Sequence, residues 1–80
     1  TRCYEKALTS NPELQGKVTL QWTVKLDGKV RRGNTRVADS SLNNAKVEGC
    51  MVRVVNRLKF AQPDGGECVI RYPFVFNSAL

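Results

Sequence analysis

The stretch Lys17–Lys29, KVTLQWTVKLDGK, decides the fold of this 80-residue chain. Its polar residues alternate without a break with apolar ones, which are Val18, Leu20, Trp22, Val24 and Leu26. This period of two is typical of a β-strand with one face on a core and the other in water. Asp27-Gly28 follows and predicts a two-residue type I′ turn, because both central positions of that turn need φ > 0. We therefore expect a β-hairpin whose apolar face is covered by the rest of the chain.

The return strand of the hairpin is predicted over residues 30–38. Val30 is even-numbered, whereas Thr35 and Val37 are odd-numbered, so a regular strand would point them to opposite faces. Gly33 lies between them, where one extra residue in a β-bulge would restore the phase.

Two amphipathic helices are predicted on either side of the hairpin. Residues 2–11 carry one apolar stripe, and Asn11-Pro12 ends this helix because a residue before proline avoids the α region. The second helix is expected over 44–59, with Asn43 or Asn44 as its N-cap. Its apolar stripe consists of Val47, Cys50, Met51, Val54, Val55 and Leu58.

The last strand is predicted over 67–76, ECVIRYPFVF. One face holds Cys68, Ile70, Tyr72, Phe74 and Phe76, and the other holds Glu67, Val69, Arg71, Pro73 and Val75. Because Pro73 cannot donate to a ladder, this strand should lie at the edge of the sheet. An apolar edge strand is a template for pairing with another chain. The alternative is that the tail 77–80 or another segment covers it.

The element order α-β-β-α-β predicts one α+β domain over residues 1–80. In this fold two helices pack on one face of a three-stranded antiparallel sheet. No run of about 18 apolar residues is present, so no membrane span is expected. The chain begins without Met or a signal peptide inside a predicted helix, which indicates a domain from a longer protein.

The sequence gives little support for an enzymatic function. The chain has no His, so a Ser/His or Cys/His nucleophile pair is excluded. No carboxylate pair and no phosphate-cradling glycine pattern is present. The cysteines, at positions 3, 50 and 68, have no metal-ligand spacing. We therefore predict no enzyme, no cofactor and no metal; the three thiols allow three single bridges, or none if all are reduced.

The charge of +6 leaves several partner classes open. The thirteen Lys and Arg are scattered and densest from Lys29 to Arg36. One hypothesis is a nucleic-acid-binding domain that uses Lys29, Arg31, Arg32 and Arg36. It is disfavoured because the order lacks the features of RRM and KH domains, and because the strand aromatics are expected in the core. The second hypothesis is capture of a partner peptide by strand addition, and a third is a dimer formed by self-pairing of the edge.

Four segments carry a resemblance to a known family. They are CYEKAL (3–8), the hairpin 18–30, VEGCMVRVVNRLKF (47–60) and YPFVF (72–76). With these the chain resembles the AgmX/PglI carboxy-terminal family, TonB-C-like domains of myxobacterial envelope and gliding-motility proteins. The resemblance implies a periplasmic interaction module of an inner-membrane-anchored protein. Such a module couples an energy-transducing machine to outer-envelope proteins by adding an extended peptide to its last strand.

The resemblance also implies particular residues. The peptide-binding edge would be formed by Glu67, Cys68, Val69, Ile70, Arg71, Tyr72, Pro73, Phe74, Val75 and Phe76, with the Glu67 and Arg71 side chains beside the peptide. It implies a disulfide between Cys3 and Cys50, whose positions on the two helix stripes agree with it; two reduced core thiols are the alternative. Cys68 departs from the family pattern and is expected to be a buried free thiol. The segment 31–35 departs as an insertion.

Overall fold

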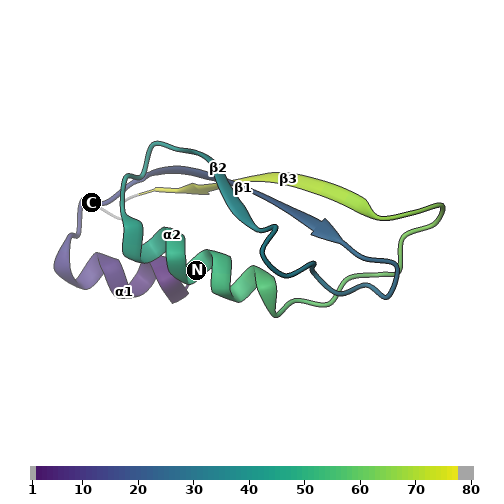
Figure 1. Cartoon of the computed structure of the whole chain (residues 1–80). Helices are drawn as coiled ribbons and strands as arrows, with labels where there is room; N and C mark the ends of the chain where they lie inside the picture. Colours follow the sequence, from purple (N-terminus) through teal and green to yellow (C-terminus); the bar gives the residue numbers. More distant parts are fainter. Residues whose placement is uncertain (1, 78–80) are drawn as a thin grey trace.

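A computed structural model describes residues 2–77 of the chain. The elements are α1 (Arg2–Ser10), β1 (Gly16–Val24), β2 (Arg36–Ser40), α2 (Ala45–Asn56) and β3 (Cys68–Phe76) (Figure 1). This α-β-β-α-β order with an antiparallel sheet confirms the predicted α+β fold class. Residues 78–80 of the expected tail lie outside the described residues.

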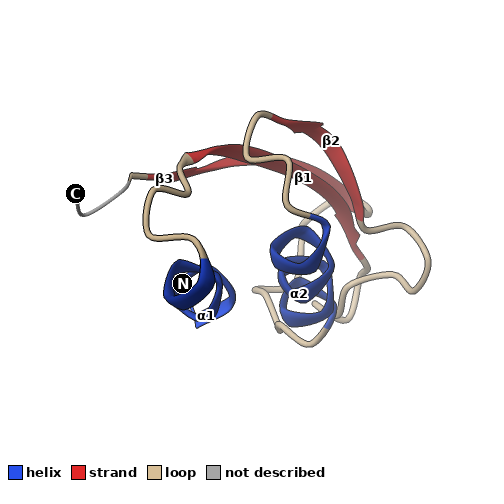
Figure 2. Cartoon of the chain, turned by 90° about the vertical axis from the view of Figure 1, so that its left-hand side faces the viewer, coloured by secondary structure: helices blue, strands red, loops and turns tan. Residues whose placement is uncertain are grey.

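The sheet has the strand order β2-β1-β3, so β1 is the central strand. β1 pairs with β3 along its whole length, from Gly16 opposite Phe76 to Val24 opposite Cys68, without a break in register. Its pairing with β2 is shorter and irregular. Figure 2 shows both helices on the same side of the sheet, α1 nearer β3 and α2 nearer β1 and β2.

The core is formed where β1 meets the helices. The alternating residues Val18, Leu20, Trp22 and Val24 are all buried, as their spacing predicts. They share one cluster with Val47, Met51 and Val55 of α2 and with Cys3 and Tyr4 of α1. Full burial of a large apolar side chain contributes about 1.5–3 kcal/mol. Burial of the apolar face of β1 against the helices therefore stabilises this small domain substantially.

The hairpin turn differs from the predicted type I′ turn. The Gly28 N–H donates to the Lys25 carbonyl at 2.9 Å, which makes Leu26 and Asp27 the central residues. Gly28 follows with φ 86°, whereas Asp27 is not among the residues with positive φ. This is a three-residue loop with a left-handed glycine, and the Asp27 carboxylate stabilises it by accepting the Lys29 N–H at 2.9 Å. Leu26 therefore lies in the turn, 61% exposed, and its predicted place in the core is wrong.

The return strand begins later than predicted. Val30 forms an isolated bridge with Val24, and β2 itself starts only at Arg36. The residues between them leave the sheet in a turn in which Gly33 has φ 78°. The bulge opposite the Thr19/Leu20 step falls at Ala38, since Thr19 pairs with Asp39 and Leu20 with Val37. The predicted strand 30–38 with a bulge at Gly33 is wrong because the 31–35 segment loops out as a whole.

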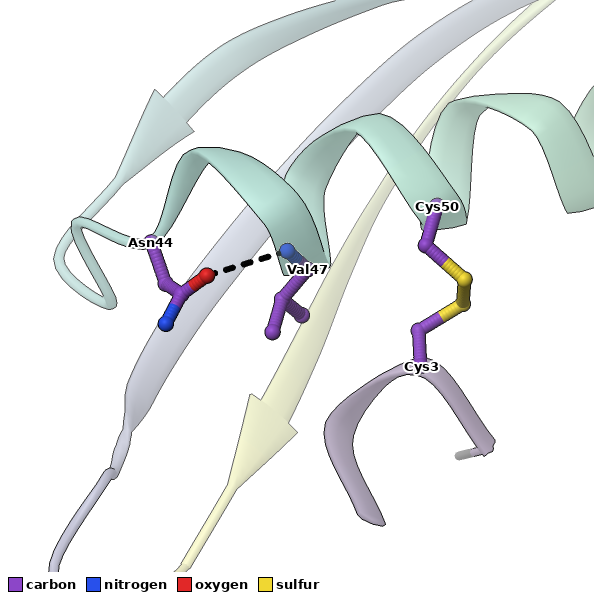
Figure 3. The surroundings of a disulfide bond; sticks show 4 residues. All are labelled: Cys3, Asn44, Val47 and Cys50. Atoms are coloured by element: carbon purple, nitrogen blue, oxygen red, sulfur yellow. Dashed lines mark hydrogen bonds between the residues drawn. A yellow bond between two sulfur atoms is a disulfide. The ribbon is translucent and has the colours of Figure 1, made fainter. Parts of the chain in front are cut away.

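Helix α2 starts as predicted and ends three residues early. The Asn44 side chain accepts the Val47 N–H at 3.1 Å and caps the helix (Figure 3). Val54 and Leu58 were expected in the buried stripe but are exposed. Figure 1 shows the reason for Val54: α1 lies beside only the first half of α2. Leu58 lies beyond the end of the helix at Asn56.

A disulfide joins the two helices. Cys3 and Cys50 are bonded, with their Cα atoms 5.6 Å apart (Figure 3). This is the pairing that the family resemblance implies. Cys68 is a free cysteine, but it is exposed rather than buried. The loop after α2 packs its Phe60 ring against Trp22 of β1 (centroids 6.0 Å apart) and leaves the start of β3 without such a cover.

The disulfide gives a first prediction. Replacing both cysteines in Cys3→Ala/Cys50→Ala should lower the free energy of unfolding by about 4 kcal/mol, because the bond closes a long loop in the unfolded chain. The sequence separation of the pair is 47 residues. Urea unfolding measures the change, and Cys68→Ser is the control that should leave stability unaltered. An equal effect of the control would show that the bridge is not the cause.

A second prediction concerns the contact of the hairpin with the loop after α2. A Cβ on Gly28 would lie 2.3 Å from the Phe60 carbonyl oxygen, and the Phe60 N–H donates to the Gly28 carbonyl at 2.8 Å. Gly28→Ala should therefore destabilise the fold by more than the strain of φ > 0 alone, which is about 1–2 kcal/mol. Gly33→Ala is the matched control, because Gly33 also has positive φ but no atom within 4 Å of the added Cβ. Equal losses in thermal unfolding would contradict the contact.

Candidate functional site

The candidate site is the outer edge of β3. In the order β2-β1-β3 one side of β3 pairs with β1, and no other strand of residues 2–77 pairs with its far side. β3 is thus an edge strand, as Pro73 predicts. It is nine residues long, compared with five for β2 at the opposite edge.

The hydrogen bonds on the β2 side of β1 reveal which backbone groups of β3 point outward. The Lys17 and Thr23 carbonyls accept the Ser41 and Arg31 N–H groups on that side. Successive residues of a strand direct their backbone groups to opposite sides. The odd-numbered residues of β1 therefore direct their backbone N–H and C=O groups to the β2 side, and the even-numbered residues direct theirs to β3.

The register between β1 and β3 shows which residues of β3 direct their backbone groups to β1. Even-numbered residues of β1 are opposite even-numbered residues of β3, as in Leu20 opposite Tyr72 and Trp22 opposite Ile70. These β3 residues bond to β1, and the odd-numbered ones present their backbone groups to the free edge. Outward carbonyls belong to Val69, Arg71, Pro73 and Val75, and outward N–H groups belong to Val69, Arg71 and Val75. The donor that Pro73 lacks is thus one that would face outward, so the proline leaves the β1 ladder intact.

The side chains of the edge are largely apolar and exposed. Val69 and Val75 are 63% and 64% exposed on the face of the sheet that points away from the core. Arg71 and Pro73 are exposed on the same face, between these two valines. The edge therefore offers apolar surface and one guanidinium next to its free backbone groups.

The helix-facing side of β3 is covered most completely at its C-terminal end. The Phe76 ring is buried and stacks on Tyr4 of α1, with centroids 4.5 Å apart. Phe74 and Ile70 are half-buried, but Tyr72 is 54% exposed, its ring 4.9 Å from that of Phe74. The predicted core positions of Cys68 and Tyr72 are wrong, because alternation gives their phase correctly but no element lies over them.

Glu67, the first residue of the predicted edge, has a different role. It precedes β3 and forms an ion pair with Arg31 of the hairpin segment. This pair connects the start of β3 to the loop between Val30 and β2. Arg71 is thus the charged side chain within β3 itself.

The basic residues of the nucleic-acid hypothesis are only partly brought together. Lys29, Arg31 and Arg32 line one open cavity, whereas Arg36 sits on β2 opposite Gln21. The structure adds Arg57 and Lys59 to the same cavity. Their proximity depends on the tertiary contact of the loop after α2 with the hairpin, and no local sequence pattern predicts it.

Electrostatics around the hairpin favour the ionised form of Asp27. The pKa of Asp27 is lowered from its ordinary value, mainly because its carboxylate accepts the Lys29 backbone N–H. The positive charges of Lys25 and Lys29 act in the same direction. The Lys25 ammonium is 3.8 Å from this carboxylate.

Metal sites and membrane spans are absent from the described residues. In residues 2–77 no three His, Cys, Asp or Glu side chains are grouped so that they could hold a metal ion. Neither described helix is long and apolar enough to cross a membrane. No family model, no curated protein and no solved structure matches the chain.

The interrupted edge generates a third prediction. Pro73→Thr restores the missing outward N–H and makes the free edge continuous, so the variant should self-associate more strongly than the wild type. Sedimentation velocity over a range of concentrations measures this. Val75→Thr is the control, because it removes an exposed apolar side chain at the edge without changing the number of donors. A monomeric Pro73→Thr variant at all concentrations would contradict the assignment of the outward groups.

Proposed function

We propose that the chain is a protein–protein interaction module that captures an extended segment of a partner protein on the free edge of β3. The observation that carries the proposal is the outer edge of β3, a nine-residue strand that β1 holds along its whole length and with which no other strand of residues 2–77 pairs. In strand addition, backbone hydrogen bonds give affinity and alternate side-chain contacts give selectivity. The free edge of β3 has both components.

The composition of the edge indicates the chemistry of the captured segment. Val69, Pro73 and Val75 favour apolar side chains on the outer face of the sheet, and Arg71 favours a carboxylate between them. On the helix side, Tyr72 offers an exposed ring. The segment we propose is therefore β-forming and mostly apolar, with an acidic residue near its centre.

Pro73 limits where the segment bonds. From Val69 to Arg71 the edge has donors and acceptors at each outward residue, whereas Pro73 offers a carbonyl alone. The strongest pairing should thus be with the first half of β3. The Glu67–Arg31 ion pair borders this half and helps to fix the start of the strand.

The cellular setting is proposed from the family resemblance together with the disulfide. Structural disulfides form and persist in oxidising compartments such as the bacterial periplasm. The Cys3–Cys50 bond is compatible with that location. We propose that the module belongs to an inner-membrane-anchored gliding or energy-transducing machine and binds outer-envelope proteins.

Nucleic-acid binding is the weaker candidate. The cavity that gathers Lys29, Arg31 and Arg32 has no aromatic residue in its lining. Single-stranded nucleic acids are bound by stacking their bases on aromatic side chains as well as by charge. The exposed ring of Tyr72 lies on β3, outside this lining.

The fourth prediction tests strand addition with two proline variants. Val69→Pro removes an outward N–H and keeps the β1 ladder, so it should weaken peptide binding by about tenfold with little loss of stability. Ile70→Pro removes an inward N–H that bonds to β1 and should destabilise the fold by more than about 1 kcal/mol. The measurement starts with a pull-down from envelope extract, followed by NMR titration of a synthetic peptide of the captured segment.

The expected NMR result is a set of backbone shifts centred on residues 67–76. Equal binding of wild type and Val69→Pro, with shifts confined to the helices, would reject the proposal. Thermal unfolding of Val69→Pro is the control for folding. The existing proline at 73, at an equivalent outward position, shows that the strand tolerates this substitution.

A further inference from the structure

A basic groove lies between the hairpin and the end of α2, separate from the edge of β3. Two adjoining cavities of about 610 and 430 Å³ form it and share Val30, Arg32, Asn56 and Arg57 in their linings. Figure 1 shows the hairpin and the loop after α2 side by side at the end of the molecule away from α1. The Lys29–Lys59 bridge and the Phe60 N–H bond to Gly28 hold these two segments together.

The groove collects most of the excess charge of the chain. Its cationic lining residues are Lys25, Lys29, Arg31, Arg32, Arg53, Arg57 and Lys59. No carboxylate is in the lining; Asp27 and Glu67, at its margin, pair with Lys25 and Arg31. Seven cations against two carboxylates account for five of the six net positive charges of the protein. The other five cations of the groove have no ion pair among residues 2–77.

Two pairs of like-charged residues hold neighbouring backbone positions in the groove. Lys29 and Lys59 are directly opposite each other across an antiparallel bridge, an arrangement that is destabilising for like charges. Arg53 and Arg57 are four residues apart at the end of α2, which is also unfavourable. The C-terminus of α2 offsets part of this positive charge, since its dipole is equivalent to about half a negative charge. Among residues 2–77, Arg32, Arg53, Arg57 and Lys59 form no ion pair that would offset this repulsion.

We infer that this groove is a binding site for a ligand with two neighbouring phosphate groups. An anion bound between these cations offsets their mutual repulsion. The attraction to several positive charges in turn holds the anion in the groove. Four of the seven cations are arginines, whose planar fork of donors matches phosphate oxygens in a bidentate way. Because Arg32 and Arg57 line both cavities, they stand between two anion positions. Such a pair of phosphates is found in free diphosphates and polyphosphates and on lipid headgroups with two phosphates, such as that of cardiolipin.

The test is an NMR titration of the intact chain with inorganic pyrophosphate at constant ionic strength. Shifts should concentrate at residues 29–33 and 53–59, and pyrophosphate should bind about tenfold more tightly than orthophosphate because it reaches both cavities. Arg32→Gln/Arg57→Gln should weaken pyrophosphate binding by about tenfold or more. Arg2→Gln/Arg36→Gln changes the net charge equally, outside the groove, and should leave binding nearly unaltered.

Thermal unfolding provides a second readout that does not depend on ligand shifts. Pyrophosphate should raise the melting temperature of the wild type, since a ligand that binds only the folded state stabilises it. The groove variant should remain folded, because its substitutions reduce repulsion, and should respond much less to pyrophosphate. Equal affinity of the two double variants, or shifts spread over all basic residues, would overturn the site.

Two further arms distinguish the source of the phosphates. Vesicles of phosphatidylcholine with cardiolipin, whose headgroup carries two phosphates, test a lipid source against vesicles with phosphatidylglycerol of equal total charge. Cardiolipin binding that requires Arg32 and Arg57 and is displaced by pyrophosphate supports this source. Pyrophosphate binding without vesicle binding supports a soluble ligand. A poly-glutamate peptide or an oligonucleotide that binds more tightly than polyphosphate of equal charge would overturn the phosphate assignment. Because every variant leaves β3 unaltered, these outcomes are independent of strand addition.

Discussion

The nine-residue antiparallel pairing between β1 and β3 is the constraint on which the rest of the structure depends. Because the pairing is unbroken, even-numbered and odd-numbered residues keep the same orientation along the whole of both strands. Even-numbered residues of β1 direct their side chains to the core and their backbone groups to β3. Odd-numbered residues bond to the β2 side. This single alternation therefore sets the buried face of β1 and, through the register, the outward backbone groups of β3, with which no described strand pairs.

Those elements whose signal is local could be predicted from the sequence. The alternation of Val18 to Val24 predicted the strand β1, the pair Asn43 and Asn44 predicted the start of α2, and Pro73 predicted the edge position of β3. In each case the residue type limits the backbone directly, by its side-chain period, its capping oxygen or its missing donor. The candidate edge was accessible to sequence reasoning for the same reason.

What could not be predicted depends on neighbours that are distant in the chain. Alternation gives the phase of Tyr72 and Cys68 but not whether a helix lies over them, and α1 covers only the Phe76 end of β3. The turn at Asp27-Gly28 was misassigned because the Asp27 carboxylate selects a three-residue loop. The basic groove was missed because residues 25–33 and 53–59 meet only through the contact of Gly28 with Phe60.

The disulfide also divides the chain into a part inside a covalently closed ring and a part outside it. Cys3 and Cys50 close a ring that contains β1, β2 and the first half of α2, whereas β3 lies outside it. A backbone break anywhere within the ring would leave both pieces in one molecule. A single break in 61–66 would leave β3 attached only by hydrogen bonds and packing. Among the strands described, β3 is therefore the one that a cleaved molecule could release, and whose place on β1 a strand from another copy could fill.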